Sequence, residues 1–212
     1  MMTLPFLSSL EKHEQQNTVS HGIGVLLGVL GAVFLLRTHQ QTATESILSL
    51  WIYVCSVVLL FFASTVYHGT TSPERKKTWQ KVDHISIYIL IAGTYTPVTL
   101  IALKDSSGWA LFYTVWIIAL VGGVLKLFFT GKYERLSLFL YLLMGWLIVF
   151  DIQNLLAVFS DKATAFLVAG GFFYTVGVWF YRWEKLQKQS FYLAFVVLAG
   201  AISHYFMILN IA

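Results

Sequence analysis

Residues 47–68 read ILSLWIYVCSVVLLFFASTVYH, a run that contains no Asp, Glu, Lys or Arg. About 20 apolar residues cross a bilayer as an α-helix, and this run lacks the two-residue alternation of a barrel strand. Similar windows recur along the chain, and the fifth of them is short. They predict seven transmembrane helices, at 21–36, 47–68, 84–103, 109–130, 136–151, 164–181 and 190–210.

The composition excludes a soluble protein. Of the 212 residues, 58% are hydrophobic and only 11% are charged, whereas soluble domains average about 25% charged residues. We therefore expect an all-α, polytopic membrane protein with a short N-terminal segment (1–20) and a single seven-helix domain (21–212). Cys55 is the only cysteine, which excludes an intrachain disulfide.

The distribution of Lys and Arg predicts the orientation of the chain in the membrane. Eleven of the fourteen lie in the N-terminal segment or the even-numbered loops, and Arg37, Lys104 and Lys162 lie in the odd-numbered loops. The positive-inside rule then places the N-terminus in the cytoplasm and the C-terminus outside, as in a bacterial inner-membrane protein. This topology explains the basic residues, so no nucleic-acid partner is expected. The run at 75–81 could also attract anionic lipid head groups, at roughly 1 kcal/mol per charge.

Polar side chains gather where the predicted helices meet the cytoplasmic side. Ser64 and His68 are four residues apart and share a helix face, and Asp83 opens the next apolar run. Ahead of the first span, a helical stripe carries Glu14, Asn17 and His21. Ionisable groups next to hydrocarbon are costly unless partnered, so the six residues form a hypothetical functional site.

Simpler structural roles exist for each of these residues. The Ser64 hydroxyl could bond its own helix backbone, and His68 could be satisfied by Asp83 or a loop carbonyl. Asp83 could cap the third helix. The stripe of the first helix could be an interface anchor.

The motifs resemble those of the haemolysin III-related proteins, which belong with the progestin and adipoQ receptor (PAQR) superfamily. The matching features are the Glu14-x2-Asn17-x3-His21 stripe, Ser64-x3-His68, Asp83-His84 and the segment IAGTYTP at 91–97. The resemblance runs from about Glu14 to the last span. It implies a seven-helix bundle with a cavity that opens towards the cytoplasm.

The same resemblance implies a zinc-dependent reaction. In the family, zinc is held by the histidine of the second span and an H-x3-H pair in the last span, and its water is thought to hydrolyse a lipid amide. His68 would then be a zinc ligand, Asp83 would orient or deprotonate the water, and Ser64 would hydrogen-bond nearby.

The last span departs from this pattern. When LAGAISHYF (198–206) is aligned with the family's ending, the H-x3-H positions fall on Ser190 and Ala194. His204 is roughly 15–21 Å further along the helix, whereas a zinc–nitrogen bond is about 2 Å. We therefore expect zinc to be absent or weakly bound, although a rearranged site from His68, Asp83, Glu14 and His21 stays open. No role is assigned to His204.

Three functions remain in view. The first is membrane-lipid sensing or homeostasis through a hydrolase-like pocket, with membrane lipids as partners and protein partners left open. The second is a zinc-dependent, ceramidase-like amide hydrolase with altered ligands. The third is a haemolysin-type pore that causes cytolysis. The middles of the spans are mainly Leu, Val, Ile and Phe, which gives a pore little support.

Overall fold

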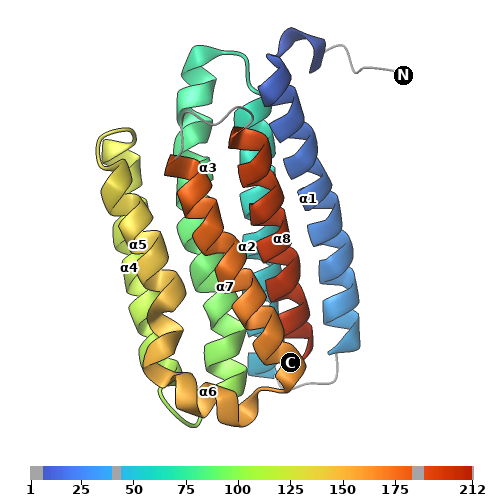
Figure 1. Ribbon diagram of the computed structural model, residues 1–212, viewed down its shortest axis with the longest axis vertical. Helices are drawn as coiled ribbons and strands as arrows, with labels where there is room; N and C mark the ends of the chain where they lie inside the picture. The colour runs from blue at the N-terminus through green and yellow to red at the C-terminus, as the bar shows by residue number, and fades with distance from the viewer. Residues whose placement is uncertain (1–6, 40–43, 183–188, 212) are drawn as a thin grey trace.

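The computed structural model describes residues 7–39, 44–182 and 189–211, and within them it contains helices and no strand. Seven helical spans are long and apolar enough to cross a membrane, as predicted (Figure 1). The elements are η1 (Leu7–Ser9), α1 (Lys12–Thr38), α2 (Thr44–Gly69), α3 (Pro73–Pro97), η2 (Val98–Ala102), α4 (Gly108–Phe129), α5 (Glu134–Trp146), η3 (Leu147–Asp151), α6 (Ile152–Val158), α7 (Asp161–Arg182) and α8 (Gln189–Leu209).

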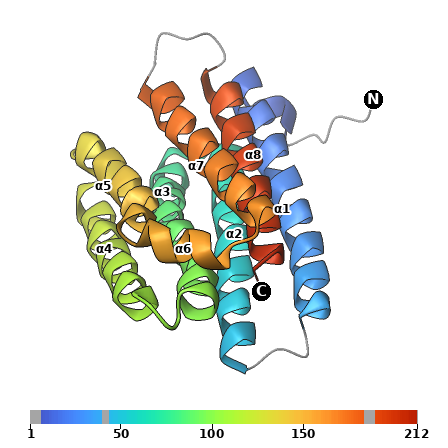
Figure 2. The same cartoon turned by 60° about the horizontal axis from the view of Figure 1, so that its bottom comes forward.

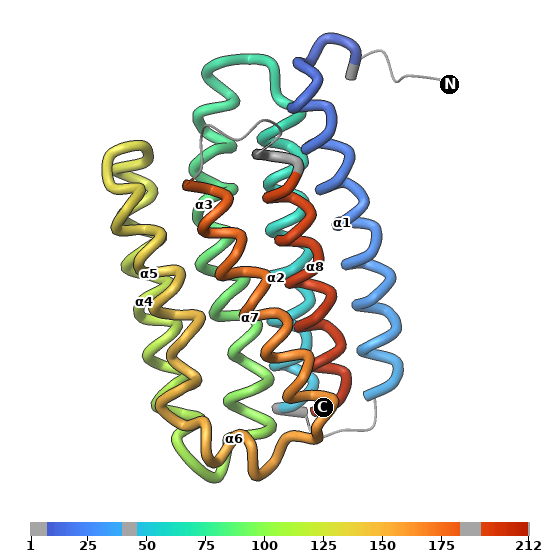
Figure 3. Tube along the Cα trace, viewed as in Figure 1, coloured from blue at the N-terminus to red at the C-terminus, as the bar shows by residue number. Residues whose placement is uncertain are grey.

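The spans run alternately up and down, so the bundle has two ends (Figure 3). The end that holds the start of α1, the α2–α3 turn and the α4–α5 turn is called the N-terminal face here (Figure 1). The described basic residues segregate between the ends. The N-terminal face carries Lys12, Arg75, Lys76, Lys77, Lys81, Lys126, Lys132, Arg135 and Arg182, and the opposite face carries Arg37, Lys104 and Lys162. Lys185 and Lys188 lie outside the described residues.

Helix α3 is the central element of the bundle (Figure 2). In its span 61% of the most apolar window is buried, against at most 44% for any other span. Helices of the bundle approach closely where a side chain packs on a glycine, between α3 and α4 and between α7 and α8. A Cβ at Gly122 would lie 2.3 Å from the Tyr88 ring, and one at Gly170 would lie 2.1 Å from His204. Both glycines are therefore close-packing points, whereas Gly171 faces open space.

The outer surface of the bundle is as apolar as its core. Phe150, Phe128 and Leu120 are 84%, 74% and 68% exposed, while Tyr53, Tyr88 and Val115 are buried inside. In water such a surface would be unstable, since large exposed apolar areas drive association. In lipid it is the surface that contacts acyl chains.

Several helix ends differ from the sequence prediction. Helix α1 begins at Lys12 rather than at residue 21, because the polar stripe is helical although it is not apolar. Helix α3 begins at Pro73 after the N-cap residue Ser72. The predicted helix-capping role of Asp83 is therefore wrong, because Asp83 lies well inside the helix.

The fifth span is longer than predicted, and its helix is interrupted. It runs from Glu134 to Val158 and changes from α-helix to 3-10 helix at Leu147. The Tyr95 hydroxyl on α3 donates to the Gly145 carbonyl at 3.1 Å and accepts from the Ile148 amide at 2.9 Å. The break thus keeps its backbone groups satisfied within the membrane.

Candidate functional site

The N-terminal ends of α1 and α3 and the C-terminal end of α2 meet at the N-terminal face (Figures 1 and 2). Every site residue predicted from these three helices lies in this region. A further residue, Lys76, joins them. We call the set the polar site: Glu14, Asn17, His21, Ser64, His68, Lys76 and Asp83.

Glu14 links the three helices. Its Oε2 accepts a hydrogen bond from His68 Nδ1 of α2 at 2.6 Å, and its Oε1 accepts one from Lys76 Nζ of α3 at 2.6 Å. The three side chains are 16%, 19% and 29% exposed, respectively. Lys76 also lies over the ring of Tyr67, 5.2 Å from its centroid. This arrangement joins a carboxylate, an imidazole and an ammonium at the rim of the bundle.

Ser64 and Asp83 form a second contact deeper in the bundle. The Ser64 hydroxyl donates a hydrogen bond to Asp83 Oδ1, and both residues are buried. The neighbouring Thr65 instead donates to the Phe61 carbonyl of its own helix, at 2.7 Å. Ser64 is thus bonded across helices, rather than to its own backbone. His68 contacts Glu14 and not Asp83, contrary to one of the simpler expectations.

Asn17 and His21 line the side of the site formed by α1. The Asn17 amide nitrogen lies 3.4 Å from His68 Nδ1. The His21 ring stacks on the His68 ring, with centroids 5.5 Å apart and planes 4° apart. Asn17 is only 2% exposed, and its Oδ1 has no hydrogen-bond partner among the described residues. A buried acceptor of this kind is rare in folded proteins unless a ligand or water satisfies it.

The contact with Glu14 favours one tautomer of a neutral His68 ring. Because Glu14 accepts from Nδ1, the proton of the neutral ring resides on Nδ1 and Nε2 keeps its lone pair. Nε2 can therefore accept a hydrogen bond or a proton, or bind a metal. Ser64 is not hydrogen-bonded to His68, since its proton is directed to Asp83. The site thus lacks the nucleophile–base contact of a serine hydrolase.

The zinc site implied by the family resemblance has no counterpart among the described side chains. In the described part of the chain, no group of three or more His, Cys, Asp or Glu side chains is placed to hold a metal. Ala194 is buried on α8 and has no donor atom. Ser190 lies in the first turn of α8, and its side chain is outside the described part.

Lys76 was not predicted as a site residue, because it lies in a run of basic residues that membrane topology already explains. Composition does not distinguish it from its basic neighbours, but helical register does. Lys76 and Asp83 are seven residues apart, two turns of α3, and so share a face. A second missed contact is the buried Lys126, whose Nζ donates to Glu134 Oε2 at 2.8 Å and closes the α4–α5 turn.

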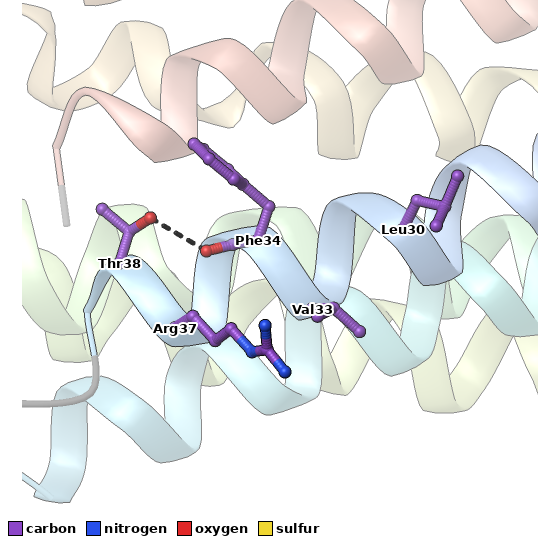
Figure 4. Close-up of a pocket in the computed structure, with 5 residues that line it drawn as sticks. All are labelled: Leu30, Val33, Phe34, Arg37 and Thr38. Atoms are coloured by element: carbon purple, nitrogen blue, oxygen red, sulfur yellow. Dashed lines mark hydrogen bonds between the residues drawn. The ribbon is translucent and has the colours of Figure 1, made fainter.

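One hollow on the surface is unrelated to the polar site. Figure 4 shows it on the outside of α1, near the opposite face, with a volume of about 360 Å³. Leu30, Val33 and Phe34 line it together with Arg37 and Thr38. The Thr38 hydroxyl donates to the Phe34 carbonyl at 2.9 Å and is thus engaged.

Comparison with known proteins places these features in a family. Residues 10–209 match the family model described as "Haemolysin-III related". The chain is 39% identical to the "Hemolysin-3 homolog" of Bacillus subtilis over 199 residues, covering 93% of each chain. It is 34% identical to "Hemolysin-3" of Bacillus cereus over 204 residues, covering 96% of this chain and 93% of the relative.

More distant similarity extends to mammals. The human "Monocyte to macrophage differentiation factor" is 24% identical over 199 residues, with 89% of this chain and 80% of the relative covered. No solved structure matches the chain. The family match spans all seven membrane-length helices and the whole polar site. The chain therefore belongs to the haemolysin III-related family of integral, multi-pass membrane proteins.

Proposed function

We propose that the polar site binds the polar end of a membrane lipid and that the protein thereby senses membrane-lipid composition. The observation that carries the proposal is the unsatisfied buried acceptor Asn17 Oδ1, which lies beside His68. A ligand that donates hydrogen bonds would satisfy it. The site lies at the end of the bundle, where a lipid's polar end and the surrounding water are both within reach.

The charges of the site define the class of lipid. Glu14 and Asp83 carry two carboxyl groups against the single ammonium of Lys76, so an anionic head group is disfavoured. The second carboxylate oxygen of Asp83, Oδ2, is a further acceptor, as is Nε2 of a neutral His68 ring. A neutral group with hydroxyl or amide N–H donors matches these acceptors. An N-acyl amino alcohol of the ceramide type has both kinds of donor.

Amide hydrolysis is the second candidate, and one contact favours it. Glu14 holds His68 through Nδ1, as a carboxylate does when it orients a histidine base or metal ligand. We place binding first because Ser64 contacts Asp83 rather than His68 and because the described residues do not provide a metal-ligand set. A pore comes third, since the centre of the bundle is packed with side chains such as Tyr53, Tyr88 and Val115.

The proposal also includes the membrane and the orientation. The excess of Lys and Arg on the N-terminal face supports a cytoplasmic location for that face. In a bacterium the corresponding membrane would be the inner one. The lipid would then be recognised from the cytoplasmic leaflet.

Lipid binding can be tested by native mass spectrometry of the purified protein with a short-chain ceramide. Asp83→Asn keeps an acceptor for Ser64 but turns the free acceptor into a donor. We expect this variant to bind about tenfold more weakly, as the loss of one hydrogen bond to a charged acceptor predicts. The control is Ser56→Ala, because the Ser56 hydroxyl is buried on α2 but donates only to the Tyr53 carbonyl, at 2.6 Å.

Three results would overturn this order of functions. Equal ceramide binding by the wild type and Asp83→Asn, with both proteins folded, would remove the polar site as the lipid site. Release of fatty acid by the wild type, abolished in His68→Ala, would move hydrolysis to first place. Conductance in planar bilayers that is absent from a mock preparation would move the pore ahead of the other candidate functions.

A further inference from the structure

A second, separate hollow lies on the N-terminal face where α2 ends and α3 begins. Its volume is about 300 Å³, and its lining includes Thr71, Ser72, Arg75 and Trp79. It faces outward from the turn, whereas Lys76 of the same helix turns inward to Glu14. The two sites therefore use adjacent faces of the first turns of α3, since Arg75 and Lys76 point about 100° apart on an α-helix.

The lining of this hollow is rich in unused hydrogen-bond donors. The Ser72 hydroxyl makes no capping hydrogen bond to α3, although Ser72 is the N-cap residue. Thr71 is exposed, and no bond from its hydroxyl to another described residue is formed. By contrast, the Thr70 hydroxyl is engaged by the Val66 carbonyl at 2.6 Å. Two hydroxyl groups can thus donate into the hollow.

The hollow also has an uncompensated positive charge. Arg75 is exposed, and among the described residues no carboxylate lies within ion-pair distance of it or of Lys77. The other basic residues of this segment are engaged, since Lys76 contacts Glu14 and Lys81 donates to the Leu127 carbonyl at 3.0 Å. A planar guanidinium next to hydroxyl donors is well suited to bind a phosphate group.

One wall of the hollow is apolar and continues into the membrane. Trp79 lines the hollow and packs edge-on against Phe62 of α2, with ring centroids 6.1 Å apart. Phe62 is 48% exposed on the outer surface of the bundle. Tryptophan is typical of the membrane–water interface, where its indole contacts head groups and its ring contacts the first methylenes.

We propose that this hollow binds the phosphate of an anionic phospholipid from the leaflet at the N-terminal face. Arg75 binds the phosphate, the hydroxyl groups of Thr71 and Ser72 donate to it, and Trp79 and Phe62 contact the acyl chains. The hollow on α1 also has one cation, Arg37, but its single hydroxyl, that of Thr38, is engaged by a backbone carbonyl and no tryptophan lines it. The proposal is independent of the ligand of the polar site, which favours neutral lipids.

Native mass spectrometry with phosphatidylglycerol and phosphatidylethanolamine tests the proposal. We expect phosphatidylglycerol to remain bound at higher collision energy than phosphatidylethanolamine. Arg75→Gln should weaken phosphatidylglycerol binding about tenfold, and Ser72→Ala should weaken it less. The matched control is Lys132→Gln, which removes one exposed positive charge from the same face at a different turn.

Three outcomes would contradict the proposal. Equal weakening by Arg75→Gln and Lys132→Gln would indicate a general charge effect instead of a site. Equal retention of the two lipids would exclude recognition of the anionic head group. Displacement of phosphatidylglycerol by an equimolar amount of inorganic phosphate would identify free phosphate as the ligand. Circular dichroism of each variant verifies that it is folded.

Discussion

The contact between Glu14 and His68 can be measured as a coupling free energy. Hydrogen bonds to charged groups contribute about 1.5–3 kcal/mol in soluble proteins, whereas double-mutant cycles between membrane helices average about 0.6 and reach about 1.7 kcal/mol. The Nδ1–Oε2 distance is 2.6 Å, and both side chains are less than a fifth exposed. We therefore expect a coupling near the top of the membrane range, about 1.5 kcal/mol.

The single variants should differ in a defined order. Glu14→Ala removes the partner of both His68 and Lys76 and leaves an ammonium unpaired, so it should cost about 2–3 kcal/mol. His68→Ala leaves the Glu14–Lys76 pair intact and should cost less. Lys76 is 29% exposed, so the cost expected for Glu14→Ala stays below the cost of breaking a fully buried ion pair.

Reversible unfolding in mixed micelles of dodecyl maltoside and sodium dodecyl sulfate, followed by circular dichroism, gives the four free energies of the cycle. A parallel cycle between Glu14 and Arg75 is the control, since the two side chains do not form an ion pair. Its coupling should be within about 0.5 kcal/mol of zero. A Glu14–His68 coupling as small as that of the control would refute the arrangement described for the polar site.

Two further predictions concern packing and the helix break. Gly122→Ala should destabilise the bundle by about 1–3 kcal/mol, because the added Cβ would lie 2.3 Å from the Tyr88 ring, while Gly123→Ala should be nearly neutral, with its nearest neighbour at 3.7 Å. Equal costs in the same micelle assay would contradict the close approach of α3 and α4. Tyr95→Phe should cost about 1–2 kcal/mol, since its hydroxyl bonds both backbone groups at the break in the fifth span, and the exposed Tyr113→Phe is the control. A Tyr95→Phe variant as stable as the wild type would show that the backbone groups at the break do not need the Tyr95 hydroxyl.

The number of spans could be predicted from the sequence because hydrocarbon thickness and backbone hydrogen bonding leave few alternatives, and their orientation in the membrane stays a prediction. The ends of the spans could not be predicted in the same way. Hydropathy ends where polar residues begin, yet α1 continues through Glu14 and Asn17 to Lys12 because the neighbouring helices provide partners for them. Hydropathy likewise did not indicate that α3 begins at Pro73, and the possible capping role of Asp83 was therefore wrong.

The members of the polar site could be proposed from residue type and position, but their pairing could not. Ser64 was expected near Asp83, and the cross-helix bond joins them. The partner of His68 is Glu14 instead, because the choice depends on how α1 and α2 pack and not on either sequence alone. Including Lys76 required knowledge of the helical register of α3, which begins eleven residues before the predicted third span.

Photocrosslinking with a diazirine-labelled ceramide, mapped by peptide mass spectrometry, tests the central proposal most directly. If the polar site holds the lipid, labelled peptides will come from the N-terminal face of α1, α2 and α3, and excess unlabelled ceramide will suppress the labelling. Asp83→Asn will lose that labelling while Ser56→Ala retains it. Labelling confined to the outer surface of the bundle, unchanged in both variants, would contradict the account.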